Sequence, residues 1–137
     1  MNLIIGSHVS YNNKSQLLGS VKEALSYKAN TFMFYTGAPQ NTNRSVIEDS
    51  LTMEAYKLMK ENNIALEKVI VHAPYIVNLA NFNNFDFSVS FLINEVERCS
   101  TLGLKYLVLH PGSAVNCSRE EAINNISKGL NLILDND

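Results

Sequence analysis

Four short apolar runs, each followed by a helical pattern, constrain this sequence more than any other feature. The runs are Leu3–Ile5, Thr31–Tyr35, Lys68–Val71 and Lys105–Leu109. Short, continuously apolar runs are typical of parallel strands that are buried on both faces. The pattern therefore predicts a parallel β-sheet whose strands are joined by helical crossovers.

Helical patterns fill the segments between and after these runs. Apolar side chains recur there three or four residues apart, as they do on the buried face of a helix. The stripes comprise Leu17, Leu18, Val21, Ala24 and Leu25; Met53, Tyr56, Leu58 and Met59; Val89, Leu92, Ile93, Val96 and Cys99; and Ala122, Ile126, Leu130 and Ile133. We expect Asp86 to cap the start of the third helix and Gly103 to follow its end. Ser118 and Glu121 form a capping box that predicts the start of the fourth helix.

This strand–helix alternation is compatible with two α/β architectures. One is a small open, doubly wound sheet, and the other is half of an eight-unit barrel, in which the four βα units stand side by side. Periodicity does not choose between them. No GxGxxG turn follows the first run and no GxxxxGK[ST] motif occurs, so the nucleotide-binding form of the open sheet loses support.

Composition limits the class of protein. The chain has 137 residues, 46% of them apolar, and a net charge of -2, which suits one domain with no broad electrostatic footprint for nucleic acid. No run approaches the roughly 18 apolar residues of a membrane helix, and the first residues lack the cationic segment of a secretory signal. We therefore expect a cytoplasmic protein with no membrane partner. Cys99 and Cys117 form no CxxC pair, and no disulfide is expected.

The histidines of the chain share one kind of position. His8, His72 and His110 all lie at or just beyond the carboxyl end of a predicted strand. In parallel α/β folds that edge carries the active site, and neutral imidazole is a good ligand for zinc. The pattern therefore favours a metal site, although carboxylates that would complete it do not stand at strand ends. Those considered are Glu48, Asp49 and Asp86, which lie in loops or at helix starts.

Four sequence motifs follow one another in order. They are GSHVS at 6–10, YTGAPQNT at 35–42, HAPYIVNL at 72–79 and LHPGS at 109–113. In this order they resemble the endonuclease IV family of apurinic/apyrimidinic endonucleases, and the resemblance covers the whole chain. It implies a TIM barrel, of which residues 1–137 would be the N-terminal half, with several Zn²⁺ ions at its carboxyl face. It also implies cleavage of the DNA backbone on the 5′ side of abasic sites, as in DNA repair.

The resemblance implies roles for individual residues. His72 and His110 match two zinc ligands of the family, whereas His8 lies in a motif at the barrel mouth without being carried over as a ligand. No catalytic side chain is assigned. The remaining ligands of the family, among them a Glu on the next strand, lie in a second half that has no counterpart before Asp137.

The implied partner is damaged double-stranded DNA. Tyr75 and Ile76 match the loop that enters the duplex at the lesion. Gln40 and Asn41 fall on a second loop that contacts DNA. Arg44 is a nearby cation that can either meet a phosphate or stand as a solvated loop residue.

Two features predict how this polypeptide behaves by itself. They are its incomplete set of metal ligands and the open edges of its sheet. Two imidazoles alone do not fill a tetrahedral zinc site. The first and fourth strands would be open edges, and apolar edges invite pairing with another chain. We therefore expect a poor catalyst that tends to self-associate.

Two alternative functions stay open. One is a non-catalytic half-barrel that only binds or assembles, which zinc analysis and light scattering would distinguish from the enzyme. The other is a metal-dependent barrel resembling sugar isomerases, which also uses strand-end histidines. An aromatic and an aliphatic residue in the HAPYIVNL loop suit invasion of a base stack better than they suit sugar binding. A comparison of abasic-DNA cleavage with sugar turnover would decide this point.

Overall fold

The structure is a computed structural model that describes residues 3–136. Within that range four strands alternate with four α-helices, as the sequence predicts. The elements are β1 (Gly6–His8), α1 (Gln16–Ser26), β2 (Thr31–Phe34), α2 (Asp49–Glu61), β3 (Ile70–His72), α3 (Phe85–Thr101), β4 (Tyr106–Val108) and α4 (Arg119–Asp135). Short 3-10 helices span Leu66–Lys68 and Phe82–Asn84.

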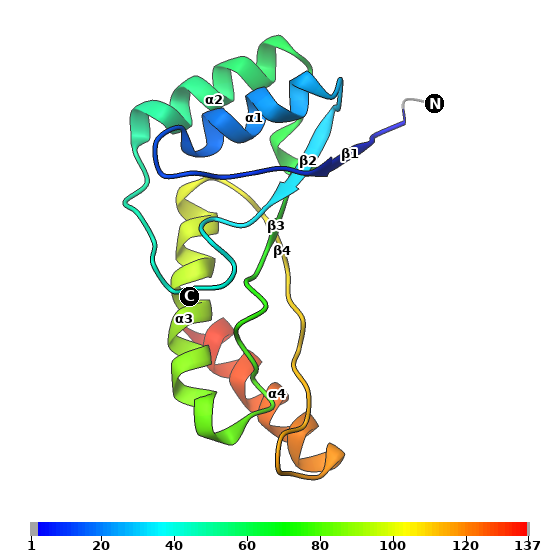
Figure 1. Cartoon of the computed structure of the whole chain (residues 1–137), viewed down its shortest axis with the longest axis vertical. Coiled ribbons are helices and arrows are strands. Elements are labelled where there is room, and N and C mark those ends of the chain that lie inside the picture. The colour runs from blue at the N-terminus through cyan, green and yellow to red at the C-terminus, as the bar shows by residue number, and fades with distance from the viewer. Residues whose placement is uncertain (1–2, 137) are drawn as a thin grey trace.

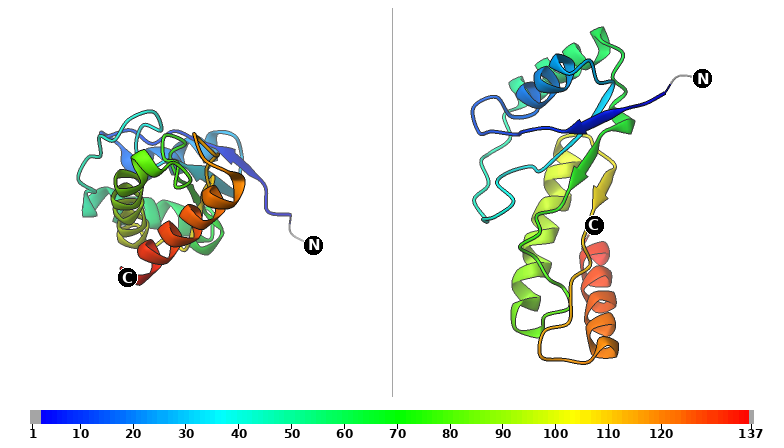
Figure 2. Two further views of the ribbon diagram at one scale, coloured as in Figure 1. Left: turned by 90° about the horizontal axis from the view of Figure 1, so that it is seen from below. Right: turned by 45° about the vertical axis from the view of Figure 1, so that its right-hand side comes forward.

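The sheet has the order β1-β2-β3-β4, and every neighbouring pair is parallel (Figure 1). This sequential order is the one found in a βα barrel, whereas a doubly wound sheet reverses its order near the middle. The topology therefore resolves the choice that periodicity left open. Figure 1 shows α1 and α2 side by side at one end of the molecule, and α3 and α4 together at the other. The segment that precedes β1 extends away from the sheet toward the N-terminus (Figure 2).

One face of the sheet is covered and the other is largely open. In β2 the side chains of Phe32 and Phe34 are buried, whereas Thr31 and Met33 are only half-buried. The expectation that all strands are buried on both faces is wrong, because β1 is exposed along its length and β4 is exposed at both ends. The face opposite the buried side chains corresponds to the interior of a barrel, which four strands do not enclose.

The first strand also lies later than hydrophobicity suggested. Leu3, Ile4 and Ile5 are exposed and precede β1, which begins at Gly6. Pairing with β2 decides this position, because Gly6 lies opposite Thr31 in the parallel ladder. A Cβ at Gly6 would overlap the Thr31 carbonyl oxygen, so only glycine permits this close approach.

Local signals at the helix ends were more reliable than the strand boundaries. The capping box is confirmed, because Ser118 Oγ accepts from the Glu121 amide at 3.1 Å and Glu121 Oε2 accepts from the Ser118 amide at 3.0 Å. Gly103 follows α3 with φ +71°, as expected of a glycine after a helix end. The prediction for Asp86 is wrong, because Asn84 is the N-cap and Asp86 lies in the first turn. A carboxylate there still interacts favourably with the helix dipole.

The core consists of two hydrophobic clusters that meet at Leu107. One lies beneath α1 and α2, and the other lies between the loop after β3 and the helices α3 and α4. Most residues of the predicted apolar stripes enter these clusters. Met53 and Leu130 are exposed instead, and Ala122 is buried outside both clusters. Within residues 3–136 no helix combines the length and the apolar content needed to cross a bilayer.

Candidate functional site

Four rings gather at the carboxyl edge of the sheet, one from each strand end. The ring of Tyr35 lies 4.7 Å from that of His8 and 5.1 Å from that of His72, measured between centroids. The centroids of His72 and His110 are 5.0 Å apart. The register explains this row, because His8 pairs with Met33 and His72 pairs with Val108, which puts all four residues on the open face. The sequence predicted the grouping of the histidines but gave Tyr35 no role.

Backbone contact orients His72. Its Nδ1 lies 2.6 Å from the carbonyl oxygen of Ala73. A carbonyl oxygen only accepts, so in the neutral ring Nδ1 carries the proton and Nε2 holds the lone pair. An N–H bond to a backbone carbonyl is the usual support of a metal-ligating imidazole. The arrangement therefore suits His72 to ligation through Nε2.

The donor set fits a metal ion only in part. A zinc site takes about four ligands in a tetrahedron. Among residues 3–136 no group of three or more His, Cys, Asp or Glu side chains is arranged to hold a metal ion. Glu48 is the N-cap of α2, and Asp49 begins that helix, so neither reaches the carboxyl edge from a strand end. The two imidazoles of His72 and His110 can thus contribute to a metal site but do not complete one.

The loops after β3 and β4 border a shallow groove. Its lining includes Tyr75, Asn78, His110 and Gly112, and its volume is ≈ 440 Å³. The side chain of Tyr75 is 57% exposed on the rim, whereas Ile76 is half-buried against the second hydrophobic cluster. An exposed aromatic ring therefore lines the same groove as one of the strand-end histidines.

Asn78 ties these two loops together. Its Oδ1 accepts from the Ser113 amide at 3.1 Å, and its Nδ2 donates to the Ser113 carbonyl at 2.9 Å. Gly112 allows this approach, because it has φ +124° and a Cβ there would overlap Asn78 Oδ1. The tie helps fix the segment that follows His110. Sequence reasoning missed it, and the only signal was the position of Asn78 inside the HAPYIVNL motif.

The other predicted DNA-contacting residues lie on the loop between β2 and α2. Gln40 is exposed, whereas Asn41 is half-buried and its Oδ1 accepts from the Asn43 amide at 3.0 Å. A hollow of ≈ 360 Å³ separates this loop from the loop after β1 and is lined by both His8 and Tyr35. The loop that carries Gln40 thus borders the same edge as the row of rings.

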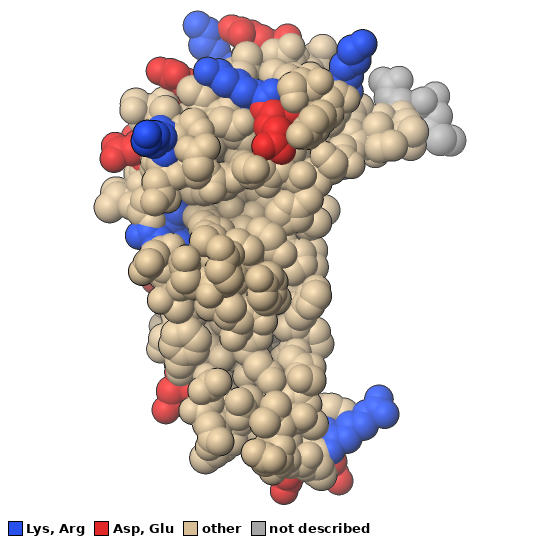
Figure 3. Space-filling view, viewed as in Figure 1, with Lys and Arg blue, Asp and Glu red and all other residues tan. Residues whose placement is uncertain are grey.

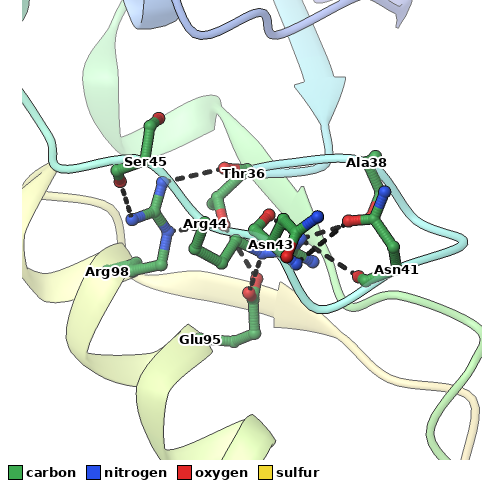
Figure 4. A network of polar contacts seen from close by, with 8 residues as sticks. All are labelled: Thr36, Ala38, Asn41, Asn43, Arg44, Ser45, Glu95 and Arg98. Carbon is green, nitrogen blue, oxygen red and sulfur yellow. Dashed lines mark hydrogen bonds and ion pairs between the residues drawn. The ribbon is translucent and has the colours of Figure 1, made fainter.

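Arg44 does not have the place that the sequence suggested. Its side chain is only 5% exposed, and its Nε donates to Glu95 Oε1 at 2.6 Å (Figure 4). The guanidinium also lies over the ring of Phe91, 4.9 Å from the centroid. Both readings of Arg44 from the sequence, a phosphate contact and a solvated loop residue, are therefore wrong, because a buried carboxylate on α3 holds the guanidinium inside the protein.

Surface charge gives little general attraction for DNA on the side seen in Figure 3. Charged side chains there lie mainly over the α1 and α2 end and at the opposite tip, and the surface between them is mostly uncharged. This agrees with the net charge of -2. Recognition of nucleic acid would therefore depend on local contacts rather than on a broad basic face.

Comparisons with known proteins agree with this geometry. Residues 21–136 match the family described as "Xylose isomerase-like TIM barrel". A protein of Acholeplasma laidlawii named "Probable endonuclease 4" is 55% identical over 136 residues, which are 98% of this chain and 46% of that protein. One of the same name from Bacillus subtilis is 51% identical over 137 residues, 97% of this chain and 45% of that protein.

A solved structure shows the same relationship in three dimensions. Endonuclease IV from Thermus thermophilus superposes with a TM-score of 0.73 at 26% identity, covering 94% of this chain and 47% of that one. The chain thus spans about half the length of the relatives it matches. The parallel βα order is therefore that of a TIM-barrel fragment. The chain belongs to the xylose isomerase-like TIM barrel family and, within it, corresponds to the N-terminal half of endonuclease IV proteins.

Proposed function

We propose that this chain supplies the N-terminal half of a zinc-dependent endonuclease that cleaves DNA on the 5′ side of abasic sites. One observation carries the proposal: the imidazoles of His72 and His110 lie 5.0 Å apart at the carboxyl edge of a sheet from this family. In this proposal residues 1–137 are half of a TIM-barrel domain, and the protein acts on damaged double-stranded DNA in the cytoplasm.

His72 and His110 are the proposed metal-holding residues. The carbonyl oxygen of Ala73 accepts from His72 Nδ1 and so orients the ring. The lone pair of Nε2 is then free to bind a metal ion, which favours ligation through that atom. Zinc held there with further ligands would make hydroxide available at neutral pH and offset the charge of the attacked phosphate. His8 and Tyr35 complete the wall of rings beside these ligands without being assigned to the metal.

The proposed contacts with DNA come from two loops. Tyr75 is exposed beside the groove after β3, and an aromatic ring there can stack on a base next to the lesion. Ile76 follows it, and apolar side chains of this kind act as wedges that unstack base steps. Unstacking costs least where a base is already missing, so this loop would favour abasic sites. Gln40 and Asn41 supply polar groups from the loop after β2.

A chimera tests this proposal most directly. The chain is fused to the portion of the Bacillus subtilis relative that lies beyond the matched part, and the product is incubated with a duplex that carries one abasic site. We expect incision on the 5′ side of the lesion, with loss of incision in the His72→Ala and His110→Ala chimeras. An undamaged duplex is the substrate control. A folded chimera that leaves the abasic duplex intact would contradict the proposal.

Sugar isomerisation is the second candidate, because the matched family is described as xylose isomerase-like. The relatives named above are instead called endonuclease 4, and the 57% exposure of Tyr75 suits a duplex better than a small sugar. The same chimera assayed with free aldoses separates the two. Turnover of sugar without incision of DNA would favour the isomerase.

We also propose that the 137-residue chain pairs with a second copy of itself. β1 and β4 each have only one strand partner among the described residues, and all four strands are parallel. β4 of one copy can therefore pair with β1 of the other, and two such junctions close a ring. Closure would cover Tyr106 and Val108, which are exposed on the open face. Light scattering should show a dimer, and a monomer at high concentration would contradict this.

A further inference from the structure

The loop at 37–45 is folded around a single side chain. Arg44 Nη1 donates to the carbonyl oxygens of Ala38 at 3.3 Å, Asn41 at 3.2 Å and Asn43 at 2.8 Å. Figure 4 shows these carbonyls converging on the guanidinium from the loop. Without secondary structure of its own, the loop uses the guanidinium to satisfy its backbone acceptors. The shape of this segment therefore depends on where Arg44 is held.

Helix α3 holds Arg44 through Glu95. The Glu95 side chain is fully buried; its Oε1 accepts from Arg44 Nε at 2.6 Å and its Oε2 accepts from Thr36 Oγ1 at 2.8 Å. Arg98, one turn later on α3, donates to the Thr36 carbonyl at 2.8 Å and to the Ser45 carbonyl at 2.6 Å. The two ends of the loop and its centre are thus fixed to one helix.

We call Thr36, Arg44, Glu95 and Arg98 the loop clamp. Arg44 pairs directly with the Glu95 carboxylate, whereas Arg98 is linked to that carboxylate only through the Thr36 hydroxyl. All three charged side chains are almost removed from solvent. A guanidinium suits this task because its planar donors can serve Glu95 and several carbonyls at once, which an ammonium group cannot do. Gly37 leaves room for it, since a Cβ there would lie 2.7 Å from Arg44 Cδ.

We infer that Glu95 is a positioning residue for DNA recognition: acting through Arg44, it sets the loop conformation that presents Gln40 and Asn41. The inference rests on the proposed function, because it assigns the loop to contacts with the lesion. Arg44 itself is buried and faces Glu95, so its effect on DNA is indirect. A loop fixed before binding loses less entropy when it meets a ligand, which raises affinity without any new contact.

Arg44→Lys tests the inference, because lysine keeps the positive charge but not the fork of donors. A lysine also binds phosphate as a point charge, so a residue that merely contacted phosphate would tolerate the change. Arg119→Lys is the matched control, since Arg119 is exposed at the start of α4. Hydrogen exchange of the amides at 38–44 is measured without DNA, and the affinities of the chimera described above for an abasic and an undamaged duplex are measured beside it.

We expect Arg44→Lys to speed exchange in the loop and to weaken binding of the abasic duplex by roughly tenfold. The affinity falls because a few loop side chains must then be ordered when the duplex binds. Binding of the undamaged duplex and the Arg119→Lys control should stay unchanged. If Arg44→Lys does not fold, Gly37→Ala displaces the guanidinium while leaving every charge in place. Glu95→Gln, which removes the charge that holds Arg44, should loosen the same amides.

The outcomes distinguish the loop clamp itself from its proposed role in DNA binding. Unchanged exchange in the loop would overturn the clamp. Faster exchange with unchanged abasic affinity would overturn the positioning role but not the clamp. A parent chimera that binds both duplexes equally would instead count against the proposed function, and the exchange data would still decide whether Glu95 fixes the loop.

Discussion

Replacing Thr36 by valine isolates the polar contribution of the loop clamp. The Thr36 hydroxyl is fully buried; it donates to Glu95 Oε2 at 2.8 Å and accepts from Arg98 Nε at 3.0 Å. Valine has nearly the same shape, so Thr36→Val opens no cavity. The substitution therefore removes two hydrogen bonds to charged groups and leaves both ionic side chains with fewer partners.

The size of the effect follows from these two bonds. A hydrogen bond to a charged group contributes about 1.5–3 kcal/mol, so their loss should lower the free energy of unfolding by about 3 kcal/mol. We take the lower end of that range because Glu95 keeps Arg44, and Arg98 keeps the Thr36 and Ser45 carbonyls. With an m-value of about 2 kcal/mol per molar urea, the unfolding midpoint should fall by about 1.5 M.

Thr36→Ser is the matched control, because it keeps the hydroxyl and loses only a methyl group. Its cost should be about 1 kcal/mol, from the lost burial of that methyl. Urea unfolding followed by circular dichroism measures both variants at one protein concentration, which keeps any self-association constant. A Thr36→Val chain as stable as Thr36→Ser would refute the argument, since the buried hydroxyl would then contribute nothing to the clamp.

Other predictions concern the helix cap, the buried thiol and the exposed tyrosine. Ser118→Ala should lower the free energy of unfolding by about 1 kcal/mol in the same urea assay, because α4 loses its N-cap; an unchanged midpoint would contradict the capping box. Burial, with the nearby charge of Glu95, raises the pKa of Cys99 from 9.0 to about 12. The folded state therefore holds this proton more tightly than the unfolded state, so its contribution to stability is present below pH 9.0 and is lost as the pH rises toward about 12. Unfolding at a series of pH values should show a smaller decline in Cys99→Ala, and an identical decline would count against the assignment. Tyr75→Ala should weaken binding of an abasic duplex by about 1–3 kcal/mol, the value of one stacked base, while the zinc content of the chimera stays the same. Loss of zinc in that variant would show that Tyr75 has been assigned the wrong role.

Local chemistry explains which elements could be predicted from the sequence. The capping box of Ser118 and Glu121 and the glycine at Gly103 depend on neighbours within a few residues, so the sequence contains the whole signal. The strand predicted at Thr31–Tyr35 was equally clear, because the run is short, continuously apolar and rich in aromatic residues, and β2 spans Thr31–Phe34. The predicted first strand, Leu3–Ile5, precedes the observed β1. The position of β1 depends on the close approach of Gly6 to Thr31, which hydrophobicity does not encode.

In the candidate site, too, features set by local sequence could be predicted, whereas those set by contacts between distant residues could not. Strand ends placed His72 and His110 correctly at one edge, since the register of parallel strands brings their carboxyl ends together. Arg44 was misplaced because its exposure is decided by Glu95, which lies 51 residues later on α3. A buried ion pair across that distance leaves no periodic mark in the sequence. The role of the histidines as ligands stays a prediction.

Zinc stoichiometry of the chimera tests the central claim most directly. The metal content per polypeptide is measured by elemental analysis for the parent chimera and for its His72→Ala, His110→Ala and His8→Ala variants, with folding checked by circular dichroism. We expect the His72→Ala and His110→Ala variants each to lose bound zinc. The His8 variant, whose ring lies beside the site without a ligand role assigned to it, should retain its zinc. Full zinc content in both the His72 and His110 variants would contradict the claim that these two imidazoles share a metal site.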